Sequence, residues 1–396
     1  MPASPSTARA INDRLALDHL QREGPLTAGQ LKQLTGLSRP SVADLVDRLT
    51  EAGLIAVVGE AGEQRRGPNA RLYGIVADRA HLAALDVRTE GVAVVVADLL
   101  GRVLAEAALP IDAASGTGPA VEQAVALVER VVKEAGADRL HTVGIGAPGL
   151  IDPVTGELRD SVSLPEWHRR LVAALQERLP EARVSVENET NLAALAEQRD
   201  GAAHDRDTFV LLWLGHGTGA AVVLDGVLRR GASGGTGEIG FLPVPGTSGP
   251  PSATDCAGGF HSLAGSAAIV KLAGEYGLTA PEPDGEPPAA GVVRAAVQRP
   301  DDDGAGRFLD TLADRIALGV ASVAAVLDPG CVVLGGEVGQ AGGPELAARV
   351  EERIRRISPL PTEVRAGALG GAAVLRGALL TAGSRAQDDL FAPRER

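Results

Sequence analysis

The stretch VLLWLGHGTGAAVVLDGVL, residues 210–228, contains a strand pattern, a Gly/Thr turn, a second strand, an Asp-Gly turn and a third strand. Three apolar runs separated by turn residues have the same order earlier in the chain, namely LAALDV, GVAVVVADL and RVLAEAALPI. A repeated three-strand opening predicts two duplicated lobes with a cleft between them. Helical patterns surround these strands, so the fold class is α/β; they lie at residues 119–135, 167–179, 193–200, 262–276 and 308–326.

A different pattern precedes the first lobe. Residues 11–23 form a predicted helix that Gly24-Pro25 ends, and Thr27 can cap a second helix with Leu31 and Leu34 facing inward. A third helix follows from Ser38, and its apolar residues share one buried face: Val42, Leu45, Val46 and Leu49. Its outward-facing residues are Arg39, Ser41, Asp44 and Arg48.

Two short strands follow the third predicted helix. LIAVV and RLYGIV enclose the loop GEAGEQRRGPNA, which has the pattern of a β-wing. Helix, helix, turn, helix and wing predict a winged helix-turn-helix, whose third helix enters the major groove of DNA. Three-helix modules of this size also bind proteins, and this alternative stays open. The expected DNA contacts are Arg39, Ser41, Arg48, Arg65, Arg66 and Arg71.

Composition and charge limit the classes of function. The 396 residues suffice for two or three domains, and the net charge of −13 argues against a protein that coats nucleic acid generally. Residues 1–76 nevertheless carry nine Lys and Arg against eight Asp and Glu, a net charge of +1, so only this segment can approach DNA without strong repulsion. We found no apolar signal region and no run of about 18 apolar residues. We therefore expect a cytoplasmic protein without membrane contact.

Taken in order, eight blocks of the chain resemble the landmarks of the ROK family. They are RRGPNARLYGI, LDVRTEGVAVVVADLLGRVL, GIGAPGLIDPVTGEL, VENETNLAALAE, LGHGTGAAVVLDG, GASGGTGEIGFLPV, LDPGCVVLGGEV and LGGAAVLRGALL. The family groups sugar-responsive repressors with sugar kinases on an actin-like, ribonuclease H-like ATPase fold of two lobes. The resemblance extends from about residue 10 to residue 382. Because repressors of the family carry an N-terminal winged helix, it implies a regulator.

The resemblance also implies domain boundaries. We expect a winged helix-turn-helix over residues 1–78 and a ROK domain over residues 79–390. Lobe one would comprise about 79–195 together with a C-terminal helix at about 371–384, and lobe two about 196–370. The closing residues, SRAQDDLFAPRER, have the pattern of a frayed tail.

Two departures from the kinase pattern predict that catalysis is lost. Kinases of the family have a first turn resembling Asp-x-Gly-Gly-Thr, whose glycines let backbone amides approach phosphate. Here Arg88 and Thr89 replace both glycines, and Glu90 brings a negative charge. The second turn, Gly215-His216-Gly217-Thr218-Gly219, keeps its type. We therefore expect no bound ATP and no catalytic residue.

Glu189 stands at the position of the kinase base, where the family has Asp. A Glu is one methylene longer, and a misplacement of about 1 Å can lower a rate by about 100-fold. A longer carboxyl group can still bind a sugar hydroxyl, so Asn188 and Glu189 are better candidates for sensing than for catalysis. Helix capping before Ala193 is the alternative role.

The rest of the implied sugar pocket is also altered. Ser163 stands where the family has Asn, Glu238 matches, and His261 falls where the family has a sugar-binding Glu. The expected effector-binding residues are Ser163, Asn188, Glu189, Glu238 and His261. A lone His in a Gly-rich loop is also commonly just exposed, so His261 has this second interpretation.

The family's structural zinc site has lost its ligands. The aligned residues are Phe241 in place of His, and Ser252, Thr254 and Gly259 in place of Cys. Because zinc needs four soft or imidazole ligands, we expect no metal here. Cys256 and Cys331, the two cysteines of the chain, are too few for a disulfide framework or a cysteine-rich zinc site.

These observations favour a DNA-binding repressor with a converted sugar-kinase cleft. Its expected partners are double-stranded operator DNA and a small effector such as a sugar, and it would act as a homodimer or homotetramer. Two alternatives stay open: an active sugar kinase with an added DNA-binding domain, and a ligand-independent regulator with a vestigial cleft.

Overall fold

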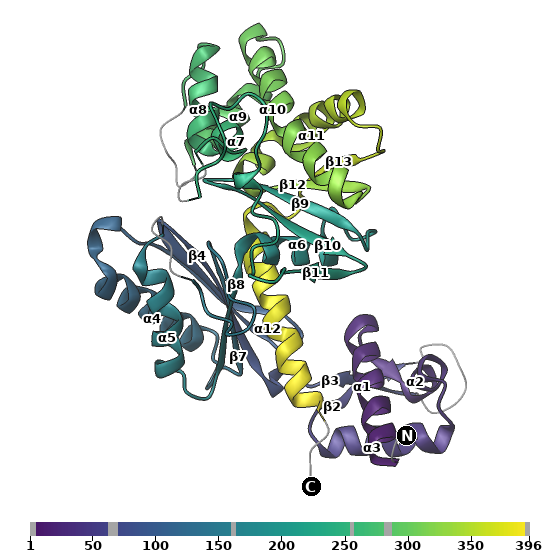
Figure 1. Cartoon of the computed structure of the whole chain (residues 1–396). Coiled ribbons are helices and arrows are strands. Elements are labelled where there is room, and N and C mark those ends of the chain that lie inside the picture. The colour runs from purple at the N-terminus through teal and green to yellow at the C-terminus, as the bar shows by residue number, and fades with distance from the viewer. Residues whose placement is uncertain (1–4, 62–69, 160–163, 254–256, 281–286, 393–396) are drawn as a thin grey trace.

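The computed structural model has three parts, a small N-terminal domain and two lobes, arranged along an elongated molecule (Figure 1). It describes residues 5–61, 70–159, 164–253, 257–280 and 287–392. The N-terminal domain contains a three-stranded sheet of order β1-β3-β2. Its elements are α1 (Pro5–Glu23), β1 (Leu26–Thr27), α2 (Ala28–Thr35), α3 (Arg39–Glu51), β2 (Ile55–Ala61) and β3 (Ala70–Ile75). The predicted winged helix-turn-helix is confirmed.

Local sequence explains the ends of α2 and α3. Thr27 and Gln30 form a reciprocal capping box at the start of α2, and Gly36 ends it with a φ of 70°. Ser38 caps α3 by accepting a hydrogen bond from the backbone of Ser41. The prediction that Leu34 faces inward is wrong, since the residue is 43% exposed. The eight-residue α2 buries only Leu31, because Leu34 lies in its last turn, before the chain reverses at Gly36.

The two lobes repeat one strand order, as the sequence predicted. Lobe one has the order β6-β5-β4-β7-β8 and lobe two the order β11-β10-β9-β12-β13. In each lobe three antiparallel strands come first and two parallel strands follow. The strands of lobe one are β4 (His81–Arg88), β5 (Gly91–Asp98), β6 (Val103–Pro110), β7 (Thr142–Ala147) and β8 (Arg183–Asn188). Those of lobe two are β9 (Phe209–Leu214), β10 (Thr218–Leu224), β11 (Val227–Arg229), β12 (Cys331–Gly335) and β13 (Glu363–Ala366).

Helices cover the outer faces of both sheets. In lobe one these are α4 (Thr117–Glu134) and α5 (Glu166–Arg178), and α6 (Glu189–Asp200) follows β8. Lobe two carries α7 (His261–Ala264), α8 (Ser266–Glu275), α9 (Pro288–Val297), α10 (Asp303–Leu327) and α11 (Gly336–Ile357). The predicted helix at 262–276 is divided at Gly265, where the backbone is extended. Short 3-10 turns lie at Ala77–Arg79, Ala113–Ser115, Ile239–Phe241 and Gly370–Ala372.

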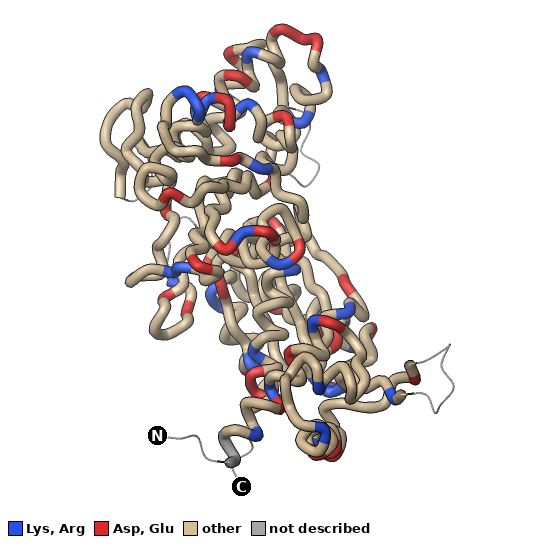
Figure 2. Tube along the Cα trace, turned by 90° about the vertical axis from the view of Figure 1, so that its right-hand side faces the viewer, with Lys and Arg blue, Asp and Glu red and all other residues tan. Residues whose placement is uncertain are grey.

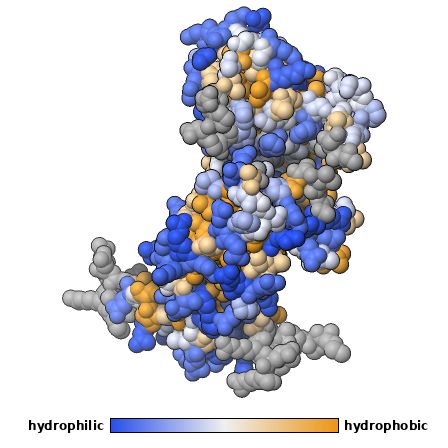
Figure 3. Space-filling model, turned by 90° about the vertical axis from the view of Figure 1, so that its left-hand side faces the viewer, coloured by the Kyte–Doolittle hydropathy of each residue, from blue (hydrophilic) through white to orange (hydrophobic). Residues whose placement is uncertain are grey.

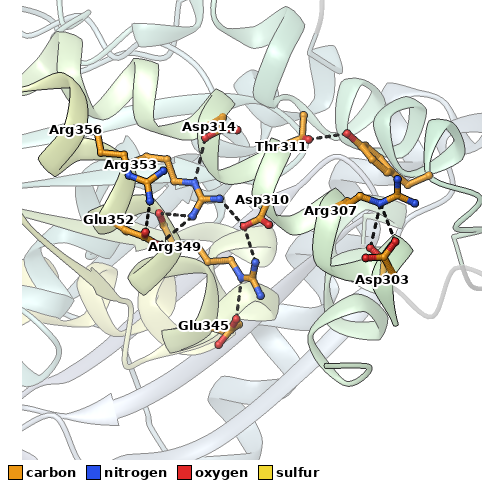
Figure 4. A network of polar contacts seen from close by, with 11 residues as sticks. Asp303, Arg307, Asp310, Thr311, Asp314, Glu345, Arg349, Glu352, Arg353 and Arg356 are labelled. Carbon is orange, nitrogen blue, oxygen red and sulfur yellow. Dashed lines mark hydrogen bonds and ion pairs between the residues drawn. The ribbon is translucent and has the colours of Figure 1, made fainter. Parts of the chain in front are cut away.

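Helices α10 and α11 are joined by a network of ion pairs on the outer layer of lobe two (Figure 4). Asp310 accepts from Arg349 at 2.6 Å and also from Arg353. Arg353 Nε lies 3.1 Å from Asp314, and its side chain is only 14% exposed. Because the largely buried Arg353 pairs with three carboxylates, we expect this network to stiffen the helical layer.

The prediction of a frayed tail is wrong for residues 384–391, because α12 (Ala373–Phe391) continues as a helix to Phe391; residues 393–396 of the predicted tail lie outside the described residues. Ala386, Gln387 and Phe391 are all buried. Figure 1 shows that α12 starts between the lobes, passes along lobe one and ends beside the N-terminal domain. Figure 2 shows acidic and basic residues interspersed along the whole length of the molecule. The last turns of α12 contain several polar residues, but their apolar face packs against other parts of the chain, including α1, that only the folded structure brings near.

Among the described residues, buried apolar side chains form three groups. One lies under the outer helices of lobe two, and another under α4 and α5 in lobe one. The third is continuous from Leu17 and Leu45 of the N-terminal domain, through α12, to Phe209 at the start of lobe two. The N-terminal domain therefore shares its core with the ROK lobes. On the face seen in Figure 3, apolar residues are exposed only in scattered groups among hydrophilic ones. In the described part of the chain, every helix is too short or too polar to span a membrane.

Candidate functional site

The candidate effector site lies where β8 of lobe one passes into α6. Asn188 caps α6, its Oδ1 accepting from the backbone N–H groups of Thr190 at 2.9 Å and Asn191 at 3.3 Å. Its Nδ2 donates to the carbonyl oxygen of Gly149 at 3.0 Å and to Glu189 Oε2 at 3.1 Å. The structure thus gives Asn188 the capping role, and its amide orients Glu189. A ligand would have to displace one of these bonds to contact Asn188 directly.

Glu189 is the first residue of α6 and carries an unusual carboxyl group. Burial raises its pKa to about 8, and the negative charges of Asp86, Glu238 and Glu337 act in the same direction. At neutral pH this group therefore keeps its proton. A protonated carboxyl group can both donate and accept a hydrogen bond, which suits a ligand hydroxyl and weakens the case for a catalytic base.

Arg88 occupies the first phosphate turn with its own side chain. Its Nη2 lies 2.8 Å from Asp86 Oδ2, and its Nη1 lies 3.4 Å from Glu337 Oε1 of lobe two. Asp86 is 3% exposed, and burial raises its pKa although Arg88 opposes the shift. His168 contacts the carbonyl oxygen of Arg88 through Nε2 at 3.2 Å. Burial lowers the pKa of His168 to about 4, so the ring is neutral and positions the Arg88 backbone without adding charge.

The second phosphate turn is intact in its backbone but faces a carboxylate. Gly215 N–H donates to the carbonyl oxygen of Gly217 at 3.0 Å. A methyl group added at Gly215 would lie 2.5 Å from Glu337 Oε2, so this acid packs against the turn. Sequence reasoning missed Glu337. The signal was the pair of glycines before it, Gly335 at the end of the buried strand β12 and Gly336 at the start of α11.

Glu187 makes a second bridge between the lobes. Its Oε2 lies 2.7 Å from Arg230 Nε, and Arg230 follows β11 of lobe two. Its Oε1 accepts from the backbone of Asn188 and from Asn191 Nδ2, both at 3.0 Å. Sequence reasoning quoted Glu187 without assigning it a role. The available signal was its position: Glu187 is the last carboxylate of β8, a strand that ends where the two lobes meet.

The remaining predicted effector residues divide into two places. Glu238 precedes the 3-10 turn at Ile239–Phe241; burial raises its pKa, and its charge acts on Glu189. His261 begins α7 and is half-buried rather than exposed; burial lowers its pKa, and His216 of the glycine turn lowers it further. The structure therefore groups Asn188, Glu189 and Glu238, and sets His261 beside the glycine turn. Ser163 lies outside the described residues.

The described part of the loop that would hold zinc in the family is held by apolar packing and backbone contacts. Gly259 forms an isolated β-bridge with Pro243, and Phe260 is fully buried in lobe two. Phe260 packs so closely on Gly319 that an added methyl group there would lie 2.5 Å from the ring. In the described ranges no group of three or more His, Cys, Asp or Glu could hold a metal. Of the aligned positions, Thr254 lies outside these ranges, as does Cys256.

The candidate DNA surface lies at the start of α3. Arg39 and Ser41 are exposed there, and Arg71 is exposed on β3. Arg65 and Arg66 lie outside the described residues.

Arg48 differs from the prediction of an outward-facing DNA contact. Its Nη2 lies 2.5 Å from Asp13 Oδ1 of α1, and it also pairs with Asp44. Arg48 therefore joins α3 to α1, because its position one turn before the helix end brings it within reach of α1.

Comparisons with known proteins match both parts of the chain. The model of the ROK family matches residues 82–384, and the model of the MarR family matches residues 11–67. A putative xylose repressor of Caldicellulosiruptor sp. (strain Rt8B.4) is 23% identical, with 88% of this chain and 87% of that protein aligned. The dual regulator NagC of Escherichia coli K12 is 27% identical, and the alignment covers 60% of this chain and 58% of NagC.

The solved structures that resemble this chain include a regulator and kinases. A ROK family transcriptional regulator, a homologue of the E. coli MLC protein, superposes with a TM-score of 0.76 at 22% identity, covering 97% of this chain and 98% of its own. A ROK family glucokinase from Streptomyces griseus, in complex with glucose and AMPPNP, gives a TM-score of 0.63 at 25% identity. The alignment covers 99% of that kinase but 77% of this chain. The winged helix is thus matched in the regulator.

Proposed function

The chain belongs to the ROK family, and from this premise we propose that it is a DNA-binding transcriptional repressor whose ROK domain senses a sugar or a similar small polar ligand. One observation carries the proposal: a winged helix-turn-helix and a complete two-lobed ROK domain lie in one chain and share a continuous core. Named repressors among its relatives, for xylose and for N-acetylglucosamine, support a carbohydrate as the effector class.

Catalysis is the activity that we propose is absent. A nucleotide phosphate would need the two glycine turns open, yet Arg88 fills one and Glu337 faces the other. Glu337 would repel a phosphate group, and Arg88 is already neutralised by Asp86. Glu189 in turn holds a proton at neutral pH. An active kinase is the second candidate, and Mg-ATP turnover with a panel of hexoses tests it directly.

A homodimer is the simplest assembly for operator binding. Two winged helices related by a two-fold axis would read half-sites spaced by about 34 Å, or a multiple of it. The ligand would act only if it binds the DNA-competent and DNA-incompetent arrangements with unequal affinity. The ion pairs Arg88–Glu337 and Glu187–Arg230 both join the lobes near Glu189. A ligand that binds at Glu189 would therefore act on the angle between the lobes.

Selection of fragmented genomic DNA by the purified full chain at near-physiological salt tests the proposal. We expect enrichment of a two-fold-symmetric site, lost when Arg39 is changed to Ala and weakened when the wing arginines are replaced. Arg299→Ala is the matched control, because this arginine is exposed on lobe two, away from α3. Failure of the unmodified chain to enrich any sequence would refute operator binding.

A thermal-shift panel of sugars tests effector sensing separately. A sugar that raises the unfolding temperature of the unmodified chain, but not of a Glu189→Ala variant, would identify the cleft as its site. If no sugar shifts the unfolding temperature, the vestigial-cleft alternative is favoured.

A further inference from the structure

We propose that α12 acts as a rigid rod that transmits changes in the angle between the lobes to the DNA-binding domain. Its first end contacts α6, and we call this contact the hinge. Its far end contacts α1 through Arg14, Asp388 and Phe391, and we call this contact the joint. The inference rests on the proposed function only in that it explains how a ligand in the cleft would alter DNA binding. The mechanical connection itself is a property of the folded chain and can be measured without DNA or ligand.

The first end of α12 is fixed to the hinge. Gly377 packs against the carbonyl oxygen of Leu192 in α6 so closely that any side chain at 377 would overlap it. Arg376 Nε lies 2.6 Å from Asp200 Oδ2 at the end of α6. Helix α6 in turn begins with Glu189. The first turns of α12 therefore rest on the helix that carries the candidate effector residue.

The buried carboxylate of Glu197 accepts hydrogen bonds from the segment that leads into α12. Glu197 of α6 accepts backbone hydrogen bonds from Ala202 at 2.7 Å, Ala368 at 3.1 Å and Leu369 at 3.0 Å. Glu197 is 2% exposed, so its carboxylate depends on these backbone donors in place of water. The chain leaving lobe two after β13 is thus fixed to α6 just before α12 begins. A change in lobe angle would pull on both at this point.

The middle of α12 lies flat on the sheet of lobe one. A methyl group added at Gly144 of β7 would lie 2.6 Å from the carbonyl oxygen of Ala378, so the helix backbone touches the strand. Near its end, Asp389 Oδ1 lies 2.8 Å from Arg183 Nη1 of β8. A 19-residue helix spans about 28 Å, so α12 reaches from α6 to the DNA-binding domain as one continuous element.

The far end of α12 meets the DNA-binding domain. Arg14 of α1 pairs with Asp388 at 2.8 Å, and its guanidinium lies 5.6 Å from the centre of the Phe391 ring. Phe391 is 6% exposed and belongs to the same buried group as Ala16 and Leu17 of α1. Figure 1 shows this end of α12 beside the DNA-binding domain. Arg14 also pairs with Asp18, so the joint is tied to the body of α1.

The DNA-binding domain is also connected to lobe one by the chain itself, and the effect of this covalent link must be distinguished from that of α12. The chain passes from β3 to β4 through Ala77–Arg79, and Leu99 N–H donates to the carbonyl oxygen of Ala77 at 3.1 Å. This covalent link joins the DNA-binding domain to lobe one but does not reach the hinge. A signal carried by α12 needs the joint, and a signal carried by the link does not.

A double-variant cycle tests whether α12 transmits changes from the hinge to α1. Hydrogen exchange of the full chain is followed by mass spectrometry at residues 8–23. Arg376→Ala loosens the hinge end, and Phe391→Ala removes the joint. We expect Arg376→Ala alone to speed exchange in α1 by about twofold to fivefold, as expected for loss of a partly exposed ion pair. In the Phe391→Ala background, where α1 already exchanges about tenfold faster, Arg376→Ala should add nothing.

Controls keep each outcome informative. Arg385→Ala, at an exposed position on the same helix, should leave α1 unchanged, and peptides from α10 report on global unfolding. If Phe391→Ala fails to fold, Asp388→Asn removes the ion pair with less disruption. The proposal is overturned if Arg376→Ala leaves α1 exchange unaltered, or if its effect is equal in both backgrounds. Genomic DNA selection with the unmodified chain reports on the proposed function independently of this result.

Discussion

Replacing Glu189 with Gln should flatten the pH dependence of stability and stabilise the chain at pH 8. The carboxyl group titrates near pH 4.5 in the unfolded chain and at about 8 in the folded chain. Between these values the folded state holds a proton that the unfolded state has released. The free energy of unfolding therefore falls as pH rises through this window, and the proton-linked stability is fully present only below about pH 4.5.

The magnitude follows from the number of protons and the setting of the side chain. One fully retained proton would give a slope of about 1.4 kcal/mol per pH unit. Glu189 is only partly shielded from solvent, and Asp86 and Glu238 share its negative field, so we expect about 0.5–1 kcal/mol per unit between pH 5 and 8. Gln keeps a side-chain carbonyl oxygen for hydrogen bonding but cannot ionise, so the variant should lose most of this slope.

Urea unfolding at pH 5, 6, 7 and 8, followed by the fluorescence of Trp167 and Trp213, measures the slope in both proteins. Glu275→Gln, at an exposed position of α8, is the matched control and should keep the slope of the unmodified chain. Equal slopes for the unmodified chain and Glu189→Gln would refute the reasoning. A Glu189→Gln variant that is less stable than the unmodified chain at pH 8 would do the same.

Three further substitutions test single features of the fold, each by urea unfolding. Glu197→Ala leaves three backbone N–H groups without their acceptor and should lower the free energy of unfolding by about 3 kcal/mol, whereas Glu197→Gln should lower it by less. Gly237→Ala should lower it by about 1–3 kcal/mol, because Gly237 has a φ of +90° and an added methyl group would overlap the carbonyl oxygen of Ala220; a fully stable variant would contradict this packing. Arg48→Ala should lower the free energy of unfolding by about 1 kcal/mol, because the ion pair with Asp13 of α1 is lost. Arg39→Ala should leave the free energy of unfolding unchanged and reduce DNA affinity. The reverse pattern would restore Arg48 as a DNA contact.

The elements that sequence predicted are those with strong local signals. The caps at Thr27 and Ser38, the apolar face of α3 and the repeated strand order all depend on residues close together in the chain. The helices α9 and α11 were not predicted. Their Ala-rich and Gly-containing sequences resemble a loop when read locally, and α11 contains Gly343 with a φ of 53° and Pro344. These helices form because their apolar residues find a common core in lobe two.

By itself, the sequence determined the order of domains, the duplicated lobes and the departures of Arg88 and Glu189 from the kinase pattern, because backbone preferences and hydrophobic periodicity are local. Only the tertiary structure decided the partners of charged groups: Arg88 with Glu337, Arg230 with Glu187, and Arg48 with Asp13. The same holds for α12, whose last turn is stable because Phe391 reaches α1 across most of the chain. The physical reason is that ion pairing and burial depend on distance in space, which residues far apart in sequence acquire only through folding.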